Sequence, residues 1–272
     1  MVVFPIAKIN IGLSVTSKRQ DGFHNIETIF YPVGLCDALE FVVSDKSEKK
    51  DILTVTGINT GIPAEDNILI KTIALLREKT DFPFLKIHLH KAIPVGAGLG
   101  GGSSDAACLM KSVSRHFGIN LDNQSLKTMA LGVGSDCPFF IDGKPSLASG
   151  RGEIMTPVEL NLSGLYLVIL NPGVGISTAE AYKNCKPRIP SASLSELFKL
   201  PVYEWKNSIV NYFEEFAFAK HPVIGEVKDD LYNSGAIFSL MSGSGSSVYG
   251  IFKNKPELPH ELRKFVIWEN QI

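Results

Sequence analysis

The chain has 272 residues, of which 44% are hydrophobic and 20% are charged. That length exceeds the roughly 100–200 residues of a typical domain, so we expect one large domain or two domains that share a cleft. The 27 Lys and Arg residues nearly balance the 28 Asp and Glu residues. This composition argues against a disordered chain and against a strongly basic nucleic-acid-binding protein.

No apolar run in the sequence approaches the ~18–20 residues of a membrane span. The N-terminus also lacks the basic and apolar stretches of a secretory signal. We therefore expect a cytoplasmic protein that binds neither membrane nor nucleic acid. The four cysteines, Cys36, Cys108, Cys137 and Cys185, have no metal-ligand or redox spacing, so we expect reduced thiols.

The first 60 residues are typical of strands and turns. Strands are expected within 2–15, 28–34 and 37–44, with a polar hairpin at 17–22 and a solvated turn in the charged stretch 46–51. This part of the chain is therefore predicted to be rich in β-structure.

The next segment changes to helical spacing. A helix is predicted over about 67–79 behind a capping Asp or Asn, followed by a strand at 85–89. After the glycine-dense stretch 96–102, a helical stripe of apolar residues runs from Ala106 to Phe117 and stops at Gly118. A second helix, about 123–131, leads into a predicted loop at 132–138, where two glycines and a proline occur.

The order of elements then restarts, which indicates a second domain beginning near residue 158. A buried strand is expected at 166–170, helices within 178–228, and an exposed loop at 186–191. Strands are expected at 236–240 and 248–252, before a last helix and strand. The predicted domains are 1–157 and 158–272.

The segment from Pro94 to Ser104 lies between a strand and a helix start and has five glycines in seven positions. Glycines let backbone amides approach an anion closely, and a helix N-terminus adds unpaired N–H groups, so the segment predicts a phosphate-binding loop. It is not a Walker A motif, because no Lys stands between Gly102 and Ser103. It does satisfy G-x-G-x-x-G, with Asp122 about twenty residues further on, so a dinucleotide site is an alternative, although no β-rich run precedes Asp122.

This loop resembles the phosphate-binding motif of the GHMP small-molecule kinases, which include galactokinase, homoserine kinase and mevalonate kinase. The resemblance extends over nearly the whole chain through five further segments. They are Ala7 to Leu13, Asp21 to His24, Glu65 to Asn67, Gly134 to Phe139 and Asn171 to Gly173. Their order and spacing are similar to those of the branch whose acceptor is a cytidyl diphosphate derivative of methylerythritol.

The resemblance implies a fold, a reaction and cofactors. The fold would be α+β with two domains: an N-terminal ATP-binding domain with a left-handed βαβ-type glycine loop and a smaller, ferredoxin-like C-terminal domain. The reaction would be the ATP-dependent phosphorylation of the acceptor's 2-hydroxyl in non-mevalonate isoprenoid synthesis, with Mg²⁺. The implied ATP-binding residues are Asn67, Pro94, Val95, Gly96, Ala97, Gly98, Leu99, Gly100, Gly101, Gly102, Ser103 and Ser104.

Two residues are candidates for catalysis. Phosphoryl transfer to an alcohol needs an acceptor for the hydroxyl proton and cations around the developing charge. Asp136, in front of Pro138, could point into a cleft, although it could also simply start a turn. Lys8 interrupts an apolar strand, where a solvated outer face is the alternative. By resemblance, Lys8 pairs with Asp136 and orients the hydroxyl.

An aromatic residue beside an imidazole suits a nucleobase, because one can stack on it and the other can bond to its edge. Phe23 and His24 form such a pair. By resemblance, Phe30 and Tyr182 are aromatic walls around the cytosine ring and Asn10 lies near the methylerythritol hydroxyls. Each of these could instead be a packing residue, and Asn67 could be an ordinary helix cap.

Some features depart from the family or stay open. Tyr212, in the stretch Asn211 to Glu214, replaces a common Asp, so no catalytic role is assigned to that stretch, and Phe23 stands where Tyr is common. Asp105 could act near Mg²⁺, whereas His88 and His90 lack a third ligand and are expected at the surface. Another GHMP kinase or a catalytically silent nucleotide-binding regulator remains an alternative, and monomer and homodimer are both open.

Overall fold

The computed structural model describes residues 1–272, which form two compact units assembled from separate stretches of chain. Unit 1 comprises residues 1–7, 34–95 and 100–144, and unit 2 comprises residues 8–33, 96–99 and 145–272. The long strands β2 (Ile6–Lys18) and β3 (His24–Cys36) contribute residues to both units. The compact units are thus discontinuous in sequence, whereas the division at residue 157 predicted above is continuous and stays a prediction.

Unit 1 is built on a four-stranded sheet in the order β1-β4-β6-β5. Its strands are β1 (Val2–Val3), β4 (Ala38–Val43), β5 (Ile52–Gly57) and β6 (Leu85–Lys91). Along β6 the buried Leu85, Ile87 and Leu89 alternate with residues on the open face, which is the period of a half-buried strand. Strands β5 and β6 are parallel, and helix α1 (Ile68–Arg77) lies between them in the chain.

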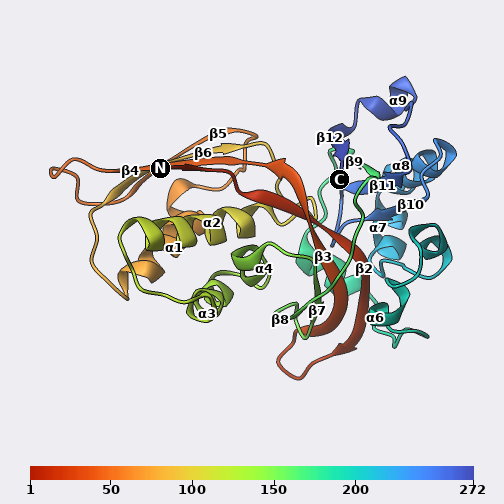
Figure 1. The fold of residues 1–272 in the computed structure, drawn as a ribbon, viewed down its shortest axis with the longest axis horizontal. Helices are drawn as coiled ribbons and strands as arrows, with labels where there is room; N and C mark the ends of the chain where they lie inside the picture. The colour runs from red at the N-terminus through yellow and green to blue at the C-terminus, as the bar shows by residue number, and fades with distance from the viewer. The chain divides into compact units, whose positions relative to one another are not determined.

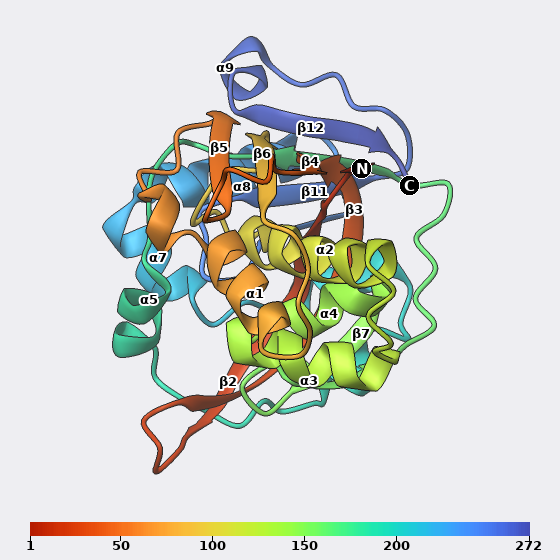
Figure 2. The same ribbon diagram turned by 90° about the vertical axis from the view of Figure 1, so that its left-hand side faces the viewer.

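Helices cover one face of this sheet (Figures 1 and 2). Helix α1 and helix α2 (Gly101–His116) lie beneath the strands, and α3 (Asn123–Val133) and α4 (Cys137–Asp142) lie further out. Phe41 of β4 packs edge-on against His116 of α2, with ring centroids 5.5 Å apart. The loop predicted at 132–138 is shorter in the structure and spans 134–136, because α3 extends to Val133 and α4 begins at Cys137, where Pro138 fits the first turn of a helix.

Unit 2 contains two sheets. The first has the order β2-β3-β7-β8, and its strands β7 (Ser146–Ser149) and β8 (Ile154–Pro157) were not predicted. The second is antiparallel, in the order β10-β11-β9-β12, with strands β9 (Tyr166–Leu170), β10 (Phe238–Met241), β11 (Val248–Phe252) and β12 (Val266–Gln271). This order, with helices after the first and third strands, is the ferredoxin-like arrangement expected from the resemblance.

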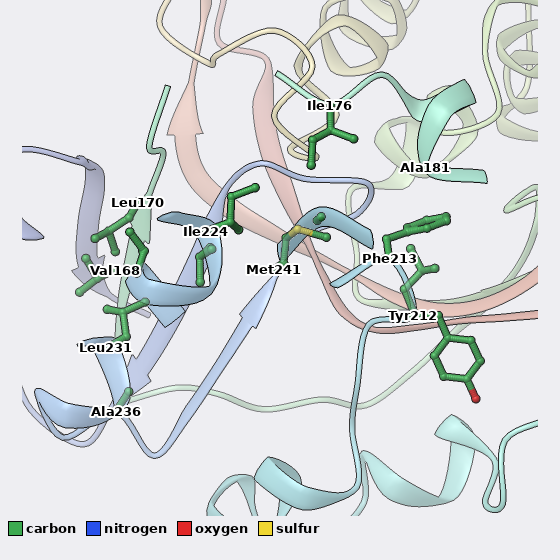
Figure 3. Close-up of a cluster of buried hydrophobic side chains, with 14 of the residues drawn as sticks. Val168, Leu170, Ile176, Ala181, Tyr212, Phe213, Ile224, Leu231, Ala236 and Met241 are labelled. Carbon is green, nitrogen blue, oxygen red and sulfur yellow. The ribbon is translucent and has the colours of Figure 1, made fainter. Parts of the chain in front are cut away.

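The helices of unit 2 are short. They are α5 (Thr178–Asn184), α6 (Leu194–Leu197), a 3₁₀ helix (Val202–Asn207), α7 (Glu214–Lys220), α8 (Pro222–Asn233) and α9 (His260–Arg263). Buried side chains from α8 and the sheet, including Ile224, Leu231, Val168 and Met241, form one apolar core with Phe213 (Figure 3). No helix of the chain combines the length and the apolar character that crossing a membrane requires.

Candidate active site

Helix α2 in unit 1 begins directly after the glycine-dense stretch. Its N-cap residue, Gly100, has a left-handed backbone with φ 71° and provides no side-chain cap. The first backbone N–H groups of α2 therefore have no helical partner and can bind an anion. The helix starts five residues before the predicted apolar stripe, and its first residue, Gly101, packs closely against Lys91 and Ile93. A Cβ there would lie 2.9 Å from Cγ2 of Ile93 and 3.1 Å from Nζ of Lys91.

A buried charge cluster lies under this helix start. Nζ of Lys91 forms ion pairs with Asp37 and, at 2.9 Å, with Oδ2 of Asp105. Oδ1 of Asp37 accepts the backbone N–H groups of Ala92, at 2.6 Å, and of Ile93, at 2.9 Å. The cluster therefore ties the strand end before the glycine stretch to the helix after it. It also shows that the Asp105 carboxyl faces Lys91 in the protein interior.

One lysine cannot neutralise two buried carboxylates. Oδ1 of Asp105 is buried without a hydrogen-bond partner. Burial, followed by the charge of Asp37, raises the pKa of Asp105 to about 8, against the lowering effect of Lys91. Burial therefore favours the protonated form of Asp105 at neutral pH, in which the contact with Lys91 is a hydrogen bond.

Asp136 lies at the N-cap position of α4, with its backbone in the helical region and no side-chain cap bond. The next residue, Cys137, is completely buried, and its thiol hydrogen-bonds with the Ser103 side chain. Burial raises the pKa of Cys137 to about 11, so the thiol stays protonated. This contact connects the first turn of α2 to the residue after Asp136.

Lys8 lies on β2 in unit 2 and is 3% exposed, which excludes a solvated outer face. Its Nζ donates to Oδ1 of Asn10 at 2.5 Å and to the backbone oxygen of Gly98 at 2.9 Å. It also lies 5.1 Å from the centre of the Phe30 ring. Nδ2 of Asn10 donates to Oγ1 of Thr28 at 2.9 Å, so the amide orientation is fixed and Oδ1 faces the ammonium group.

The turn after β10 joins this network. Oγ of Ser242 donates to the backbone oxygen of Gly98 at 2.9 Å and accepts the backbone N–H of Asn10 at 3.1 Å. The approach is so close that a Cβ on Gly98, whose φ is +77°, would collide with the backbone oxygen of Ser242. The Tyr249 hydroxyl donates to the backbone oxygen of Asn10 at 3.0 Å. Residues from three distant segments thus converge on Lys8.

Aromatic side chains form a second group in unit 2. The His24 and Tyr182 rings are stacked, with centroids 5.1 Å apart and planes 20° apart, and Tyr182 meets Phe213 edge-on at 4.9 Å. Burial, and then the charge of Lys18, lower the pKa of His24, so a neutral imidazole predominates at pH 7. Phe23 is 52% exposed, and the Arg151 guanidinium lies 4.7 Å from its ring centre.

Three expected site residues have other surroundings. Phe30 lies six positions after His24 on the same strand, and its ring lies beside Lys8. Oδ1 of Asn67 accepts the Leu69 N–H at 3.0 Å, which makes Asn67 a helix cap. Asp122 caps α3 by accepting the Ser125 N–H at 2.7 Å, which removes the support for a dinucleotide site.

The two strand histidines face outward. His88 and His90 are exposed, and Oγ1 of Thr56 lies 2.9 Å from Nε2 of His88 and 3.0 Å from Nδ1 of His90. The structure contains no group of three or more His, Cys, Asp or Glu side chains arranged to hold a metal ion.

Sequence reasoning missed Tyr249 and Thr28, whose polar groups hold Asn10. It also missed Asp37 and Lys91. A lysine at the end of an otherwise alternating strand and an aspartate between two strands are ordinary surface patterns, so their burial has no local sequence signature.

Known protein families match both parts of the chain. The GHMP kinases N terminal domain model matches residues 67–144, and the GHMP kinases C terminal model matches residues 195–266. A Parabacteroides distasonis protein named 4-diphosphocytidyl-2-C-methyl-D-erythritol kinase is 48% identical over 100% of both chains. A Porphyromonas gingivalis protein of the same name is also 48% identical, over 95% of this chain and 94% of its own. The chain belongs to the 4-diphosphocytidyl-2-C-methyl-D-erythritol kinase family of GHMP kinases.

Solved structures agree with this assignment. A crystal structure of 4-(cytidine 5'-diphospho)-2C-methyl-D-erythritol kinase superposes with a TM-score of 0.81 at 30% identity, covering 99% of this chain and 98% of that one. A homoserine kinase from Cytophaga hutchinsonii, at 19% identity, has a TM-score of 0.66, covering 92% of this chain and 85% of its own, and shares the fold. The α+β GHMP kinase class expected from the sequence is therefore confirmed, and as a GHMP kinase the protein uses ATP.

Proposed function

We propose that the protein transfers the γ-phosphoryl group of ATP to the 2-hydroxyl of 4-diphosphocytidyl-2-C-methyl-D-erythritol, giving ADP and the 2-phosphate. The observation that supports this most directly is the full-length similarity to kinases of that name, in a chain that retains Lys8 and Asp136. A nucleotide-binding regulator has no physical need of a buried lysine held on three sides by Asn10, Gly98 and Phe30.

We assign the ATP phosphates to the start of helix α2. The amides of residues 101–103 lack helical acceptors there, and the positive end of the helix dipole attracts anions. Pro94 to Gly100 lead into this helix start, which is why they belong to the proposed site. For Asn67 the helix cap explains its side-chain oxygen, so we assign its contact with ATP to the remaining amide nitrogen.

Mg²⁺ is the second cofactor that we propose. Mg²⁺ keeps several waters and is usually held by substrate phosphates with one or two protein oxygens. Because the Asp105 carboxyl bonds to Lys91, we propose that the ion would be held by the ATP phosphates and by a protein hydroxyl. We assign that hydroxyl to Ser103. The ion would neutralise negative charge on the β- and γ-phosphates.

We assign the chemical step to Asp136 and Lys8. The 2-hydroxyl oxygen forms a bond to the γ-phosphorus, while the bond from that phosphorus to the β,γ-bridging oxygen breaks and its electrons leave with ADP. Asp136 accepts the hydroxyl proton, and the Lys8 ammonium stabilises negative charge on the attacking oxygen. Asn10 and Phe30, the neighbours of Lys8, are assigned to the methylerythritol part of the acceptor.

We assign the cytosine to Phe23, His24 and Tyr182. A neutral imidazole can donate one hydrogen bond and accept another, which suits the mixed donor and acceptor edge of cytosine. The exposed Phe23 ring and the stacked Tyr182 ring offer apolar faces for a base. A homoserine or mevalonate kinase would have no use for such a group.

A coupled ADP-release assay with ATP and Mg²⁺ tests this function. 4-Diphosphocytidyl-2-C-methyl-D-erythritol, homoserine and mevalonate are compared as acceptors, and selective turnover of the cytidyl compound is expected. Turnover of another acceptor would assign a different GHMP activity. No turnover by a folded protein that binds ATP would favour the silent regulator. We further propose a cytoplasmic location and a small molecule, with no nucleic acid, as partner.

A further inference from the structure

The stretch Asn211 to Glu214 lies in unit 2 just before α7, and the Asn211 side chain is 3% exposed. Nδ2 of Asn211 donates to the backbone oxygens of Met241 and Gly243, both at 2.8 Å. Oδ1 accepts the backbone N–H of Phe213 at 3.0 Å. Both amide protons are thus used, and the amide cannot turn over without placing its oxygen against two carbonyls.

The two carbonyls that Asn211 binds belong to the residues on either side of Ser242. Asn211 therefore fixes the backbone that carries the Ser242 hydroxyl. That hydroxyl bridges the Asn10 N–H, at 3.1 Å, and the Gly98 oxygen, at 2.9 Å. A third contact holds the same backbone, because Oε1 of Glu214 accepts the Met241 N–H at 3.0 Å.

The Ser242 bridge ends on the groups that hold Lys8. Nζ of Lys8 donates to Oδ1 of Asn10 and to the Gly98 oxygen. The backbone offers a second connection, because Leu13, on the strand of Lys8, exchanges hydrogen bonds of 2.9 Å with Val210 and Tyr212. A series of hydrogen bonds, joined by the covalent backbone of residues 241–243, thus runs from Asn211 through Ser242 to the ammonium group.

The apolar core anchors the Asn211 end of this series. Phe213, which is 1% exposed, and Tyr212 both belong to the apolar core of unit 2, and their rings point in different directions (Figure 3). The Arg188 guanidinium covers the Tyr212 ring at 4.4 Å. The stretch is therefore held by the packing of both rings in the core and by Arg188, and it supports the turn at 242–247.

We propose that Asn211 is a positioning residue for phosphoryl transfer, which orients Lys8 by holding Ser242 between Asn10 and Gly98. Asn211 does not touch the reacting groups. This inference rests on the proposed function only for the role of Lys8, since the hydrogen-bond series itself lies within unit 2.

The test is Asn211→Ala, with the exposed Asn254→Ala as the matched control. Because a small misplacement of a catalytic group costs up to ~100-fold in rate, we expect kcat to fall about 10- to 100-fold. Binding of CDP should change less than about 3-fold, since the cytidine group is assigned to Phe23, His24 and Tyr182. An equal loss of CDP binding would show that Asn211 serves the Tyr182 pocket through Phe213 and would overturn the proposal. So would a normal kcat.

A double-mutant cycle separates this role from a general structural one. Ser242→Ala should lower kcat like Asn211→Ala, and the double variant should be no slower than the slower single variant, because both act through one hydroxyl. If the fold-decrease of kcat in the double variant equalled the product of the decreases in the two single variants, the proposal would be contradicted. Asn211→Asp keeps the hydrogen bond from the Phe213 N–H but turns an oxygen toward two carbonyls. Its decrease in kcat should therefore be at least as large as that of Asn211→Ala. If Asn211→Ala does not fold, Ser242→Ala takes its place in the test. The proposal then requires that Ser242→Ala binds CDP normally and has a reduced kcat.

Hydrogen exchange provides a readout that needs no acceptor. In Asn211→Ala the amides of residues 241–247 and of Asn10 should exchange faster than in the wild type, and those of β12 should not. Suppose that the wild type does not turn over the cytidyl acceptor, but that these amides exchange faster in Asn211→Ala. The hydrogen-bond series would then be supported, and only the proposed function would be rejected. Unchanged exchange would reject the series.

Discussion

Nζ of Lys91 lies 2.9 Å from Oδ2 of Asp105, and both side chains are at most 3% exposed. The two residues enclose the glycine-dense stretch, since Lys91 ends β6 and Asp105 lies in the second turn of α2. With Asp37 on the same ammonium group, this relationship fixes where the loop begins and where its helix starts. It determines two measurable properties of the protein.

The first property is a dependence of stability on pH. The pKa of Asp105 is raised from 3.8 to about 8 in the folded protein. Between these values the folded chain holds a proton that the unfolded chain has lost, so Asp105 lowers stability as pH rises, by up to about 1.4 kcal/mol per unit. Below about pH 4 and above about pH 8 this contribution is constant. Urea unfolding of the wild type and Asp105→Asn from about pH 5 to about pH 8 should show a flatter profile for the variant; parallel profiles would contradict the assignment.

The second property is the dependence of the fold on the lysine charge. Lys91→Met would leave the buried Asp37 and Asp105 without a cation, which should reduce the free energy of unfolding by about 3–5 kcal/mol. Lys86→Met, on the same strand, is the control. Its side chain is 42% exposed and pairs with Asp45 at the surface, so its effect should stay within about 1 kcal/mol. Equal effects in denaturant titrations would argue against a structural role for the cluster.

Asp136→Asn should reduce kcat by about 10²–10⁴-fold, because an amide cannot accept the hydroxyl proton. ATP binding, followed by isothermal titration calorimetry, should change little, since the phosphates are assigned to the α2 N-terminus. Asp81→Asn, at an exposed position, is the control and should turn over normally. Near-normal turnover by a folded Asp136→Asn would remove Asp136 from the chemical step.

Tyr182→Ala should weaken CDP binding by about 10- to 100-fold, since stacking a base on an aromatic ring contributes about 1–3 kcal/mol. ATP binding should be unaffected. Tyr203, which is 64% exposed, gives the control Tyr203→Ala. If both variants bound CDP as tightly as the wild type, the cytosine would have to lie elsewhere.

Elements with a strong local pattern were predictable from the sequence. The helix behind Asn67, the strand at Leu85 and the helix behind Asp122 follow the predictions to within a few residues, because capping residues and apolar periodicity fix them locally. The ferredoxin-like arrangement came from the resemblance, since strand order depends on pairings between distant segments.

Other features depend on contacts that no window of sequence contains. The sequence did not predict helix α4, which begins at Cys137 near the end of the expected loop. The strands at Ser146 and Ile154 were missed because each is four residues long. The role of Asn211 depends on Met241 and Gly243, about thirty residues away in the chain. A buried amide and an exposed one look alike in sequence, so only the fold distinguishes Asn211 from Asn254.

The discontinuity of unit 2 has a consequence for synthesis of the chain. Residues 8–33 are synthesised before their partners in unit 2, which include residues 145–272, so the hydrogen bonds of Asn10 form only after Ser242 and Tyr249 have been made. Closing such long loops is slow, and unpaired strands are prone to aggregation meanwhile. Strand β2 has nine consecutive buried residues, so it exposes apolar surface on the nascent chain until those partners are made, and the hydrogen bonds around Lys8 are complete only after residue 249 has been synthesised.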